Sequence, residues 1–133
     1  MKKKVALITG VNGQDGGYLS KLLLEKNYIV HGMLRRTANF KLSRLDFLKI
    51  RNKINFHPSE LNEFHNVQSL IKKIKPDIIY NLAAQSFVQY SFDNPFYTND
   101  VNYHSVINML ETLRRNKMDT KFYQASTSEM FGN

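Results

Sequence analysis

The stretch Val5-Ala6-Leu7-Ile8-Thr9-Gly10-Val11-Asn12-Gly13-Gln14-Asp15-Gly16 decides the fold. Its first four residues form a short apolar run, which is typical of a strand buried on both faces of a parallel sheet. Glycines at 10, 13 and 16 follow directly in a G-x-x-G-x-x-G spacing, and the apolar side chains of residues 18–26 recur at helical spacing. This order of strand, glycine turn and helix predicts the first unit of a dinucleotide-binding sheet.

The three glycines have distinct expected roles. One permits the tight turn, one lets the backbone approach a pyrophosphate, and the last allows the helix to pack closely on the strand. The N–H groups at the start of the helix from Gly16 to Lys26 would then face the phosphates. A plain turn remains the alternative, whereas a P-loop is excluded because no Lys-Ser or Lys-Thr follows Gly16.

Further strand-like runs outward from this stretch alternate with helical ones. Strands are expected at 29–34, 54–56, 77–82 and 121–126, and helices at about 42–48, 67–74 and 95–115. Val106, Met109, Leu110 and Leu113 are the expected core contacts of the last helix. Five strands separated by helices predict an α/β fold with a doubly wound parallel sheet, the Rossmann fold. The sequence ends seven residues after Ser126, so residues 1–133 are expected to be the N-terminal part of a domain truncated after its fifth strand.

Composition narrows the class of protein. The 133 residues contain 42% hydrophobic residues and no cysteine, which excludes disulfides and thiolate chemistry. No apolar run approaches the roughly 20 residues of a membrane-spanning helix, and no export signal is recognisable, so a cytoplasmic location is expected. The net charge of +8 is spread along the chain without a nucleic-acid motif. The four histidines lack metal-ligand spacing, and we expect neither a metal site, nor nucleic-acid or membrane binding.

The end of the second predicted strand bears on the cofactor. An NAD site usually has a carboxylate about 20 residues after the glycine motif, whereas an NADP site has arginine for the 2′-phosphate. Arg35-Arg36 stands there, with no acidic residue close by in the sequence. Two solvated arginines are the alternative, but guanidinium groups at this position favour NADP.

Residues after the fourth and fifth strands should face the ligand, because ligands lie beyond the carboxyl ends of parallel strands. Ala83 and Ala84 are small enough for a cofactor to pass, and Gln85 and Ser86 offer hydrogen bonds. If the chain stays extended after Ser126, Thr127 and Glu129 share one face and can meet one substrate. A helix-capping turn is an equal alternative, because Ser or Thr followed by Glu is also a helix-start pattern.

Four stretches together resemble the extended short-chain dehydrogenase/reductase family, and within it the GDP-mannose 4,6-dehydratases. They are TGVNGQDGGYL (9–19), Arg35-Arg36, IIYNLAAQSFV (78–88) and KFYQASTSEMFG (121–132). The resemblance implies that cofactor NADP is bound by Gly10, Val11, Asn12, Gly13, Gln14, Asp15, Arg35, Arg36, Glu60, Leu61, Leu82, Ala83, Ala84, Gln85, Ser86 and Tyr97, next to the helix start at Gly16. Relatives have Gly-Asp-Leu where this chain has Ser59-Glu60-Leu61.

The resemblance also implies the chemistry, a lyase reaction on a nucleotide-sugar, GDP-mannose or a related heptose. The sugar is oxidised at C4, loses water across C5 and C6, and is reduced at C6. Thr127 and Ser86 would bind the substrate, with Thr127 on the C4 oxygen, and Glu129 would move the C5 proton and the C6 hydroxyl. The family's Tyr-x-x-x-Lys pair belongs to a helix after residue 133, so the chain alone is expected to be an inactive cofactor-binding fragment. The full-length protein is expected to be a homo-oligomer, a dimer or tetramer.

Two other functions stay open. An NADP-dependent sugar-nucleotide epimerase or reductase shares most of these features, but it does not need an acidic residue at Glu129. A non-catalytic dinucleotide-binding module needs only the first half of the pattern.

Overall fold

The computed structural model describes residues 2–131, which form one five-stranded parallel sheet in the order β3-β2-β1-β4-β5. The strands are β1 (Val5–Thr9), β2 (Ile29–Leu34), β3 (Ile54–Pro58), β4 (Ile78–Asn81) and β5 (Lys121–Gln124). Thr9 pairs with Met33 on one side and with Asn81 on the other, so these three strands end together. The predicted doubly wound α/β fold is confirmed.

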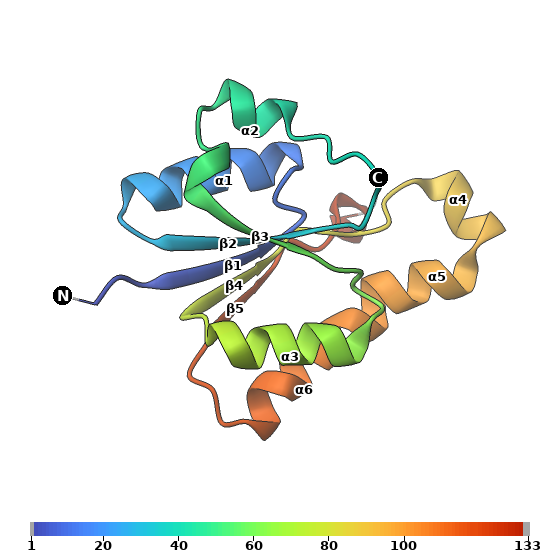
Figure 1. The fold of residues 1–133 in the computed structure, drawn as a ribbon. Helices are drawn as coiled ribbons and strands as arrows, with labels where there is room; N and C mark the ends of the chain where they lie inside the picture. The colour runs from blue at the N-terminus through green and yellow to red at the C-terminus, as the bar shows by residue number, and fades with distance from the viewer. Residues whose placement is uncertain (1, 132–133) are drawn as a thin grey trace.

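Helices cover both faces of the sheet (Figure 1). One face carries α1 (Gln14–Glu25) and α2 (Ser43–Phe47), and the other carries α3 (Phe64–Ile74) and α6 (Ser105–Arg115). The apolar side chains of β1 alternate between these layers. Ala6 and Ile8 belong to the core beneath α1 and α2, while Leu7 belongs to the core beneath α3 and α6. The period of two along a buried strand therefore places a core on each side of the sheet.

The predicted long helix from Pro95 to Arg115 is present, but its turns are not uniform. It consists of α5 (Pro95–Asn99), a π-helical segment η2 (Asp100–His104) and α6. The separate helix α4 (Val88–Asp93) precedes it, and α4 and α5 lie beyond the ends of the strands (Figure 1). Met109 and Leu113 are buried as expected, whereas Leu110 is 44% exposed. The assignment of Leu110 to the core was wrong for this part of the chain, because it lies on the side of α6 that no described element covers.

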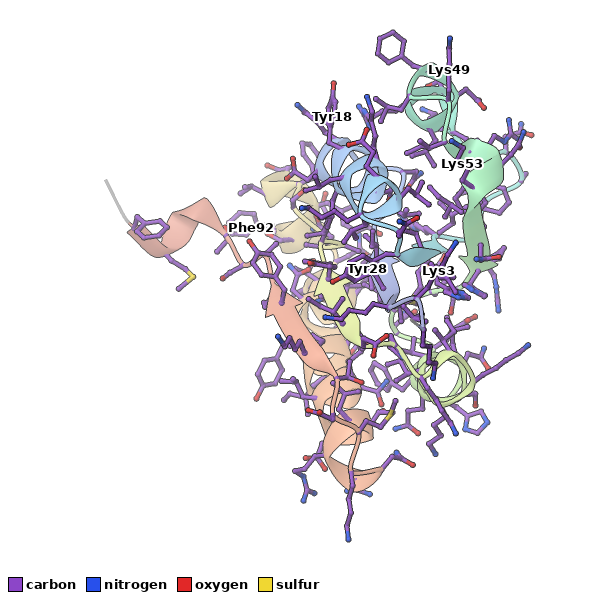
Figure 2. The ribbon with its side chains drawn as sticks, turned by 90° about the vertical axis from the view of Figure 1, so that its left-hand side faces the viewer. Lys3, Tyr18, Tyr28, Lys49, Lys53 and Phe92 are labelled. Carbon is purple, nitrogen blue, oxygen red and sulfur yellow. The ribbon has the colours of Figure 1, made fainter. Side chains whose placement is uncertain are left out.

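The chain around the end of the fifth strand differs from the predicted one. The fifth strand stops at Gln124, two residues early, and Ser126 then takes a left-handed backbone angle (φ 63°) that lies outside regular strand geometry. A 3₁₀ turn, η3 (Ser128–Phe131), follows and extends away from the sheet on the β5 side (Figure 2). A second 3₁₀ turn, η1 (Arg51–Lys53), leads directly into β3. The extended chain assumed for residues 127–129 is therefore absent, and a turn takes its place.

Candidate functional site

The glycine turn joins β1 to α1 at the carboxyl edge of the sheet. Gly10 has a φ of 66°, a conformation that L side chains rarely adopt, and its carbonyl accepts the N–H of Gly13 at 2.9 Å. A Cβ atom at Gly16 would lie 2.3 Å from the Gly10 oxygen and 2.8 Å from the Val11 Cα atom. The helix therefore approaches the strand only because residue 16 is glycine, as the spacing predicted. The free N–H groups of the first turn of α1 are held at the carboxyl edge.

Two contacts around this turn were not predicted from the sequence. The Val11 side chain is buried against Gly32 of β2, where an added Cβ would meet it at 2.6 Å. The guanidinium of Arg44, in α2, donates to the Asn12 carbonyl at 3.0 Å, and its aliphatic part lies against Gly17. Arg44 therefore adds a positive charge beside the glycine turn. Its distance of 32 residues from Asn12 in the sequence hid this contact.

A cavity of about 630 Å³ opens beside the glycine turn. It gathers most of the predicted cofactor residues from four separate strand ends. Those on its wall are Gly10, Asn12, Gly13, Arg35, Glu60, Leu61, Leu82, Ala83, Ala84, Gln85, Ser86 and Tyr97. The wall does not include Val11, Gln14, Asp15, Gly16 or Arg36. Val11 and Gly16 instead contribute to the packing that shapes the turn.

Thr9 begins a hydrogen-bond network that links the ends of β1, β4 and β5. Its buried hydroxyl donates to the Asn81 Oδ1 atom at 2.6 Å and accepts the N–H groups of Leu82 and Ala83 at 3.1 and 3.0 Å. Asn81 in turn donates to the Gln124 side chain of β5 at 2.8 Å. This network fixes where the chain leaves β4 toward the cavity. Thr9 had no expected role, although a polar residue at the end of a buried strand is a signal of such a network.

Both arginines after β2 have acidic partners in space. The Arg35 Nε atom lies 3.6 Å from a Glu60 oxygen, and the Arg36 Nη1 atom donates to Glu63 at 2.6 Å. The backbone N–H of Arg36 also donates to Glu60 at 3.1 Å. The absence of a nearby acidic residue in the sequence was thus misleading, because β3 lies beside β2 and brings the segment after it next to the arginines.

Tyr97 completes this side of the cavity. The Arg35 guanidinium carbon lies 5.6 Å from the centre of the Tyr97 ring, within the range of a cation–π contact. Burial raises the pKa of the Tyr97 phenol, and the Arg35 charge opposes that rise only in part. The phenol is therefore neutral near neutral pH. The pair presents a planar, positively charged surface of the kind on which an adenine ring stacks.

The Gln85 side chain points into its own loop. Its Oε1 atom accepts the Phe87 N–H at 2.6 Å, and its Nε2 atom donates to the Thr98 hydroxyl at 3.1 Å. The side chain of Asn102, in the π-helical segment, holds the Gln85 backbone. Its Oδ1 atom accepts the Gln85 N–H, and its Nδ2 atom donates to the Gln85 carbonyl, both at 2.8 Å. The amide of Gln85 was expected to offer hydrogen bonds to a ligand, but in this structure it shapes the loop that lines the cavity.

A second hollow, of about 520 Å³, lies between the ends of β4 and β5 and the helical segment Thr98 to Val106. Ser86 and Thr127 both line it, as two residues expected to bind one substrate should. Ala83, Ala84 and Gln85 line both hollows, which makes the two spaces neighbours. The side chain of Glu129, the other predicted catalytic residue, lies outside the described part of the structure.

Two histidines pair on the α3 face of the sheet. The Nδ1 atom of His31, in β2, lies 2.8 Å from the Nε2 atom of His57, in β3. Burial lowers the pKa of both rings. Among the side chains that the structure describes, no group of three or more His, Asp or Glu residues is placed to hold a metal ion. The same described residues contain no helix long and apolar enough to span a membrane.

Residues 7–133 match the family described as GDP-mannose 4,6 dehydratase. The GDP-mannose 4,6-dehydratase of Yersinia enterocolitica is 46% identical over 97% of this chain, and GDP-mannose 4,6 dehydratase 1 of Arabidopsis thaliana is 44% identical over 98%. The chain spans only 37% and 39% of these relatives. Among solved structures, the UDP-Glc/GlcNAc 4-epimerase of Campylobacter jejuni is 25% identical over 97% of the chain and 39% of its own length, with a TM-score of 0.81.

Proposed function

Because this chain belongs to the GDP-mannose 4,6-dehydratase family, we propose that it is the cofactor-binding front part of an NADP-dependent nucleotide-sugar 4,6-dehydratase. One observation supports this most strongly. Twelve of the cofactor residues expected from the sequence line one cavity beside the glycine turn, although they come from segments up to 87 positions apart, from Gly10 to Tyr97. The rest of the dinucleotide-binding domain and the substrate domain would follow residue 133.

The residues present fit a dinucleotide. A Cβ at Gly16 would collide with the Gly10 to Val11 backbone, and a Cβ at Gly10 would press on Ala83, so the two glycines keep the turn tight at the start of α1, where a pyrophosphate would bind. Arg35 with Tyr97 offers a surface for adenine, and the Arg35-Arg36 pair offers donors for a ribose 2′-phosphate. When bound, NADP supplies the hydride acceptor and donor. The choice of NADP over NAD rests on this arginine pair.

The proposed substrate is GDP-mannose or a closely related GDP-heptose, with the sugar in the second hollow. There the Thr127 hydroxyl would hydrogen-bond the C4 oxygen, and Ser86 would bind on the same side. Glu129 would take the C5 proton and give a proton to the C6 hydroxyl as water leaves, a task that suits a carboxyl group with a raised pKa. In the resemblance on which this mechanism draws, a tyrosine beyond this chain takes the C4 hydroxyl proton.

The test uses a protein with the full length of the relatives. It should convert GDP-mannose to a 4-keto-6-deoxy product, and Glu129→Gln should lower the rate by about 10²–10⁴ because Gln keeps the shape but cannot transfer the proton. A transient rise in NADPH absorbance without product is expected for that variant, since oxidation at C4 does not need Glu129. Normal product formation by Glu129→Gln would show that the acid/base is misassigned.

Association into a homo-oligomer is part of the proposal. Apolar side chains are exposed along α5 and α6, among them Phe96 (86%), Ile107 (41%) and Leu110 (44%). Such surfaces commonly lie in protein interfaces. Light scattering on the full-length protein tests the assignment, and a monodisperse monomer at high concentration would contradict it.

A further inference from the structure

Glu63 holds one of the two arginines expected to select the cofactor. Its Oε1 atom accepts from the Arg36 Nη1 atom at 2.6 Å, and its Oε2 atom accepts from the Asn66 side chain at 3.1 Å. Asn66 lies in the first turn of α3, so the carboxylate is anchored to a helix and not merely carried by the arginine. The hydrogen bond from Asn66, more than any other contact, lowers the pKa of Glu63. The group is therefore an anion at neutral pH.

The formal charges around Arg35 and Arg36 cancel. Glu60 and Glu63 stand against Arg35 and Arg36, so the subsite has no formal net charge where a phosphate dianion is expected. Glu60 contributes an acceptor for the Arg36 backbone N–H and lines the cavity. Glu63 has neither role. Its carboxylate occupies the Arg36 Nη1 donor, so this donor is not directed at a ligand while the ion pair is formed.

We propose that Glu63 is a specificity-determining residue that limits the affinity for NADP and leaves the affinity for NAD unchanged. This inference rests on the proposed 2′-phosphate site at Arg35-Arg36. To pair its Nη1 donor with a 2′-phosphate, Arg36 must exchange the Glu63 carboxylate for the phosphate at that donor, and the fixed carboxylate then remains close to the phosphate as a like charge. NAD carries a 2′-hydroxyl at that position, so neither the exchange nor the repulsion applies to it.

The experiment measures the affinities for NADP⁺ and NAD⁺ by calorimetry on the wild-type chain and on Glu63→Gln. Glutamine keeps an acceptor for Asn66 but loses the charge. We expect NADP⁺ to bind about 3- to 10-fold more tightly to Glu63→Gln at low salt, with a smaller gain at high salt, and NAD⁺ to change by less than about 2-fold.

Glu111→Gln is the matched control. Glu111 accepts from Arg114 and Arg115 at 2.6 to 3.0 Å in the last part of α6, and it does not line the cofactor cavity. The substitution changes the net charge of the chain by the same amount as Glu63→Gln. Both affinities should stay at the wild-type values, and an equal gain in NADP⁺ affinity here would reduce the effect to net charge and overturn the proposal.

Two further variants test whether Glu63 acts through its Asn66 anchor and through Arg36. Asn66→Ala releases the Glu63 carboxylate from its anchor, and a smaller gain in NADP⁺ affinity is expected. In an Arg36→Ala background, Glu63→Gln should lose most of its effect, and a full gain there would overturn the exchange at Arg36.

The outcomes separate this inference from the proposed cofactor. Unchanged or weaker NADP⁺ binding by Glu63→Gln overturns the role of Glu63, even if the wild-type chain prefers NADP⁺. A wild-type chain without that preference contradicts the proposed NADP selectivity, but a selective gain in Glu63→Gln would still support the role of Glu63.

Discussion

The two ends of the site are built in different ways, as β1 and β5 illustrate. β1 lies between β2 and β4, and Ala6, Leu7 and Ile8 have no exposed surface. β5 is an edge strand whose Tyr123 is 52% exposed. At the glycine turn, backbone packs against backbone, so contacts within the chain determine the shape of the turn. At the β5 end, the chain leaves an edge strand for an exposed turn, so fewer contacts fix the predicted catalytic residues.

Gly16→Ala should have the largest effect on stability, because it places a side chain directly into the close backbone packing of the glycine turn. The new Cβ would lie 2.3 Å from the Gly10 oxygen, a backbone atom that cannot move without reshaping the turn. We expect a loss of about 3 kcal/mol in the free energy of unfolding, the upper end of the usual cost of overpacking, together with a loss of cofactor binding. Urea denaturation measures the first effect and calorimetry with NADP⁺ the second.

The neighbouring Gly17→Ala is its control. There the Cβ would meet the flexible Arg44 side chain at 3.3 Å, and alanine favours the helix by about 0.8–1 kcal/mol over glycine. Its stability should stay within about 1 kcal/mol of the wild type. Equal losses in the two variants would show that general crowding along α1, and not the approach to the Gly10 oxygen, decides the effect.

Thr9→Val tests the link between the two ends. Valine keeps the branched shape but leaves the Asn81 oxygen and the N–H groups of Leu82 and Ala83 without their hydroxyl partner. The expected loss is about 2 kcal/mol, since each unpaired polar group in a buried site costs about 1–3 kcal/mol and the loop can relax in part. Chemical denaturation is the measurement, and cofactor affinity should fall as well.

Thr120→Val provides the comparison for that variant. It removes a single hydrogen bond, to the Pro76 carbonyl, just before β5. A loss of about 1 kcal/mol is expected. If the two valine variants lost the same stability, the three-strand network at Thr9 would have no special weight.

Tyr123→Thr tests the exposed end. The ring contacts Tyr80 at a centroid distance of 5.8 Å and is otherwise half exposed, and threonine suits a strand. The loss should be about 1 kcal/mol or less. A thermal melt showing a loss above about 2 kcal/mol would mean that Tyr123 is covered in solution and that the two ends are more alike than the structure indicates.

The smallest effect is expected from pH at the other edge strand, β3. Burial lowers the pKa of His31 and His57 below 6.5, so the unfolded chain binds more protons than the folded one beneath that pH. Stability from this pair is therefore complete above pH 6.5 and declines as the pH falls through the folded pKa values. Because both rings are partly exposed, the change should stay below about 1 kcal/mol. Denaturation curves at several pH values measure it, and His57→Gln should flatten the slope.

Local sequence patterns were sufficient to predict those features that depend on a few neighbouring residues. The glycine turn and the alternation of strands and helices were predicted correctly, because steric limits on the backbone and the burial of apolar faces are written in neighbouring residues. The end of β5 was misjudged, since Ser126 adopts a left-handed φ that its residue type does not signal. Leu110 was placed in the core by helical periodicity, which marks an apolar side but not what covers it.

The sequence alone determined the fold class and the glycine turn, because both follow from residue type and short-range order. Most of the residues expected around a cofactor, among them Glu60, Leu61 and Tyr97, followed from the family resemblance. Only the tertiary structure decided how those residues contact one another. It brought Glu60 and Glu63 to the arginines, turned Gln85 into its own loop and joined Thr9, Asn81 and Gln124 in one network across three strands. These contacts join residues 24 to 74 positions apart, apart from the turn at Gln85, and strand order in the sheet sets such distances. No short-range pattern carries that order.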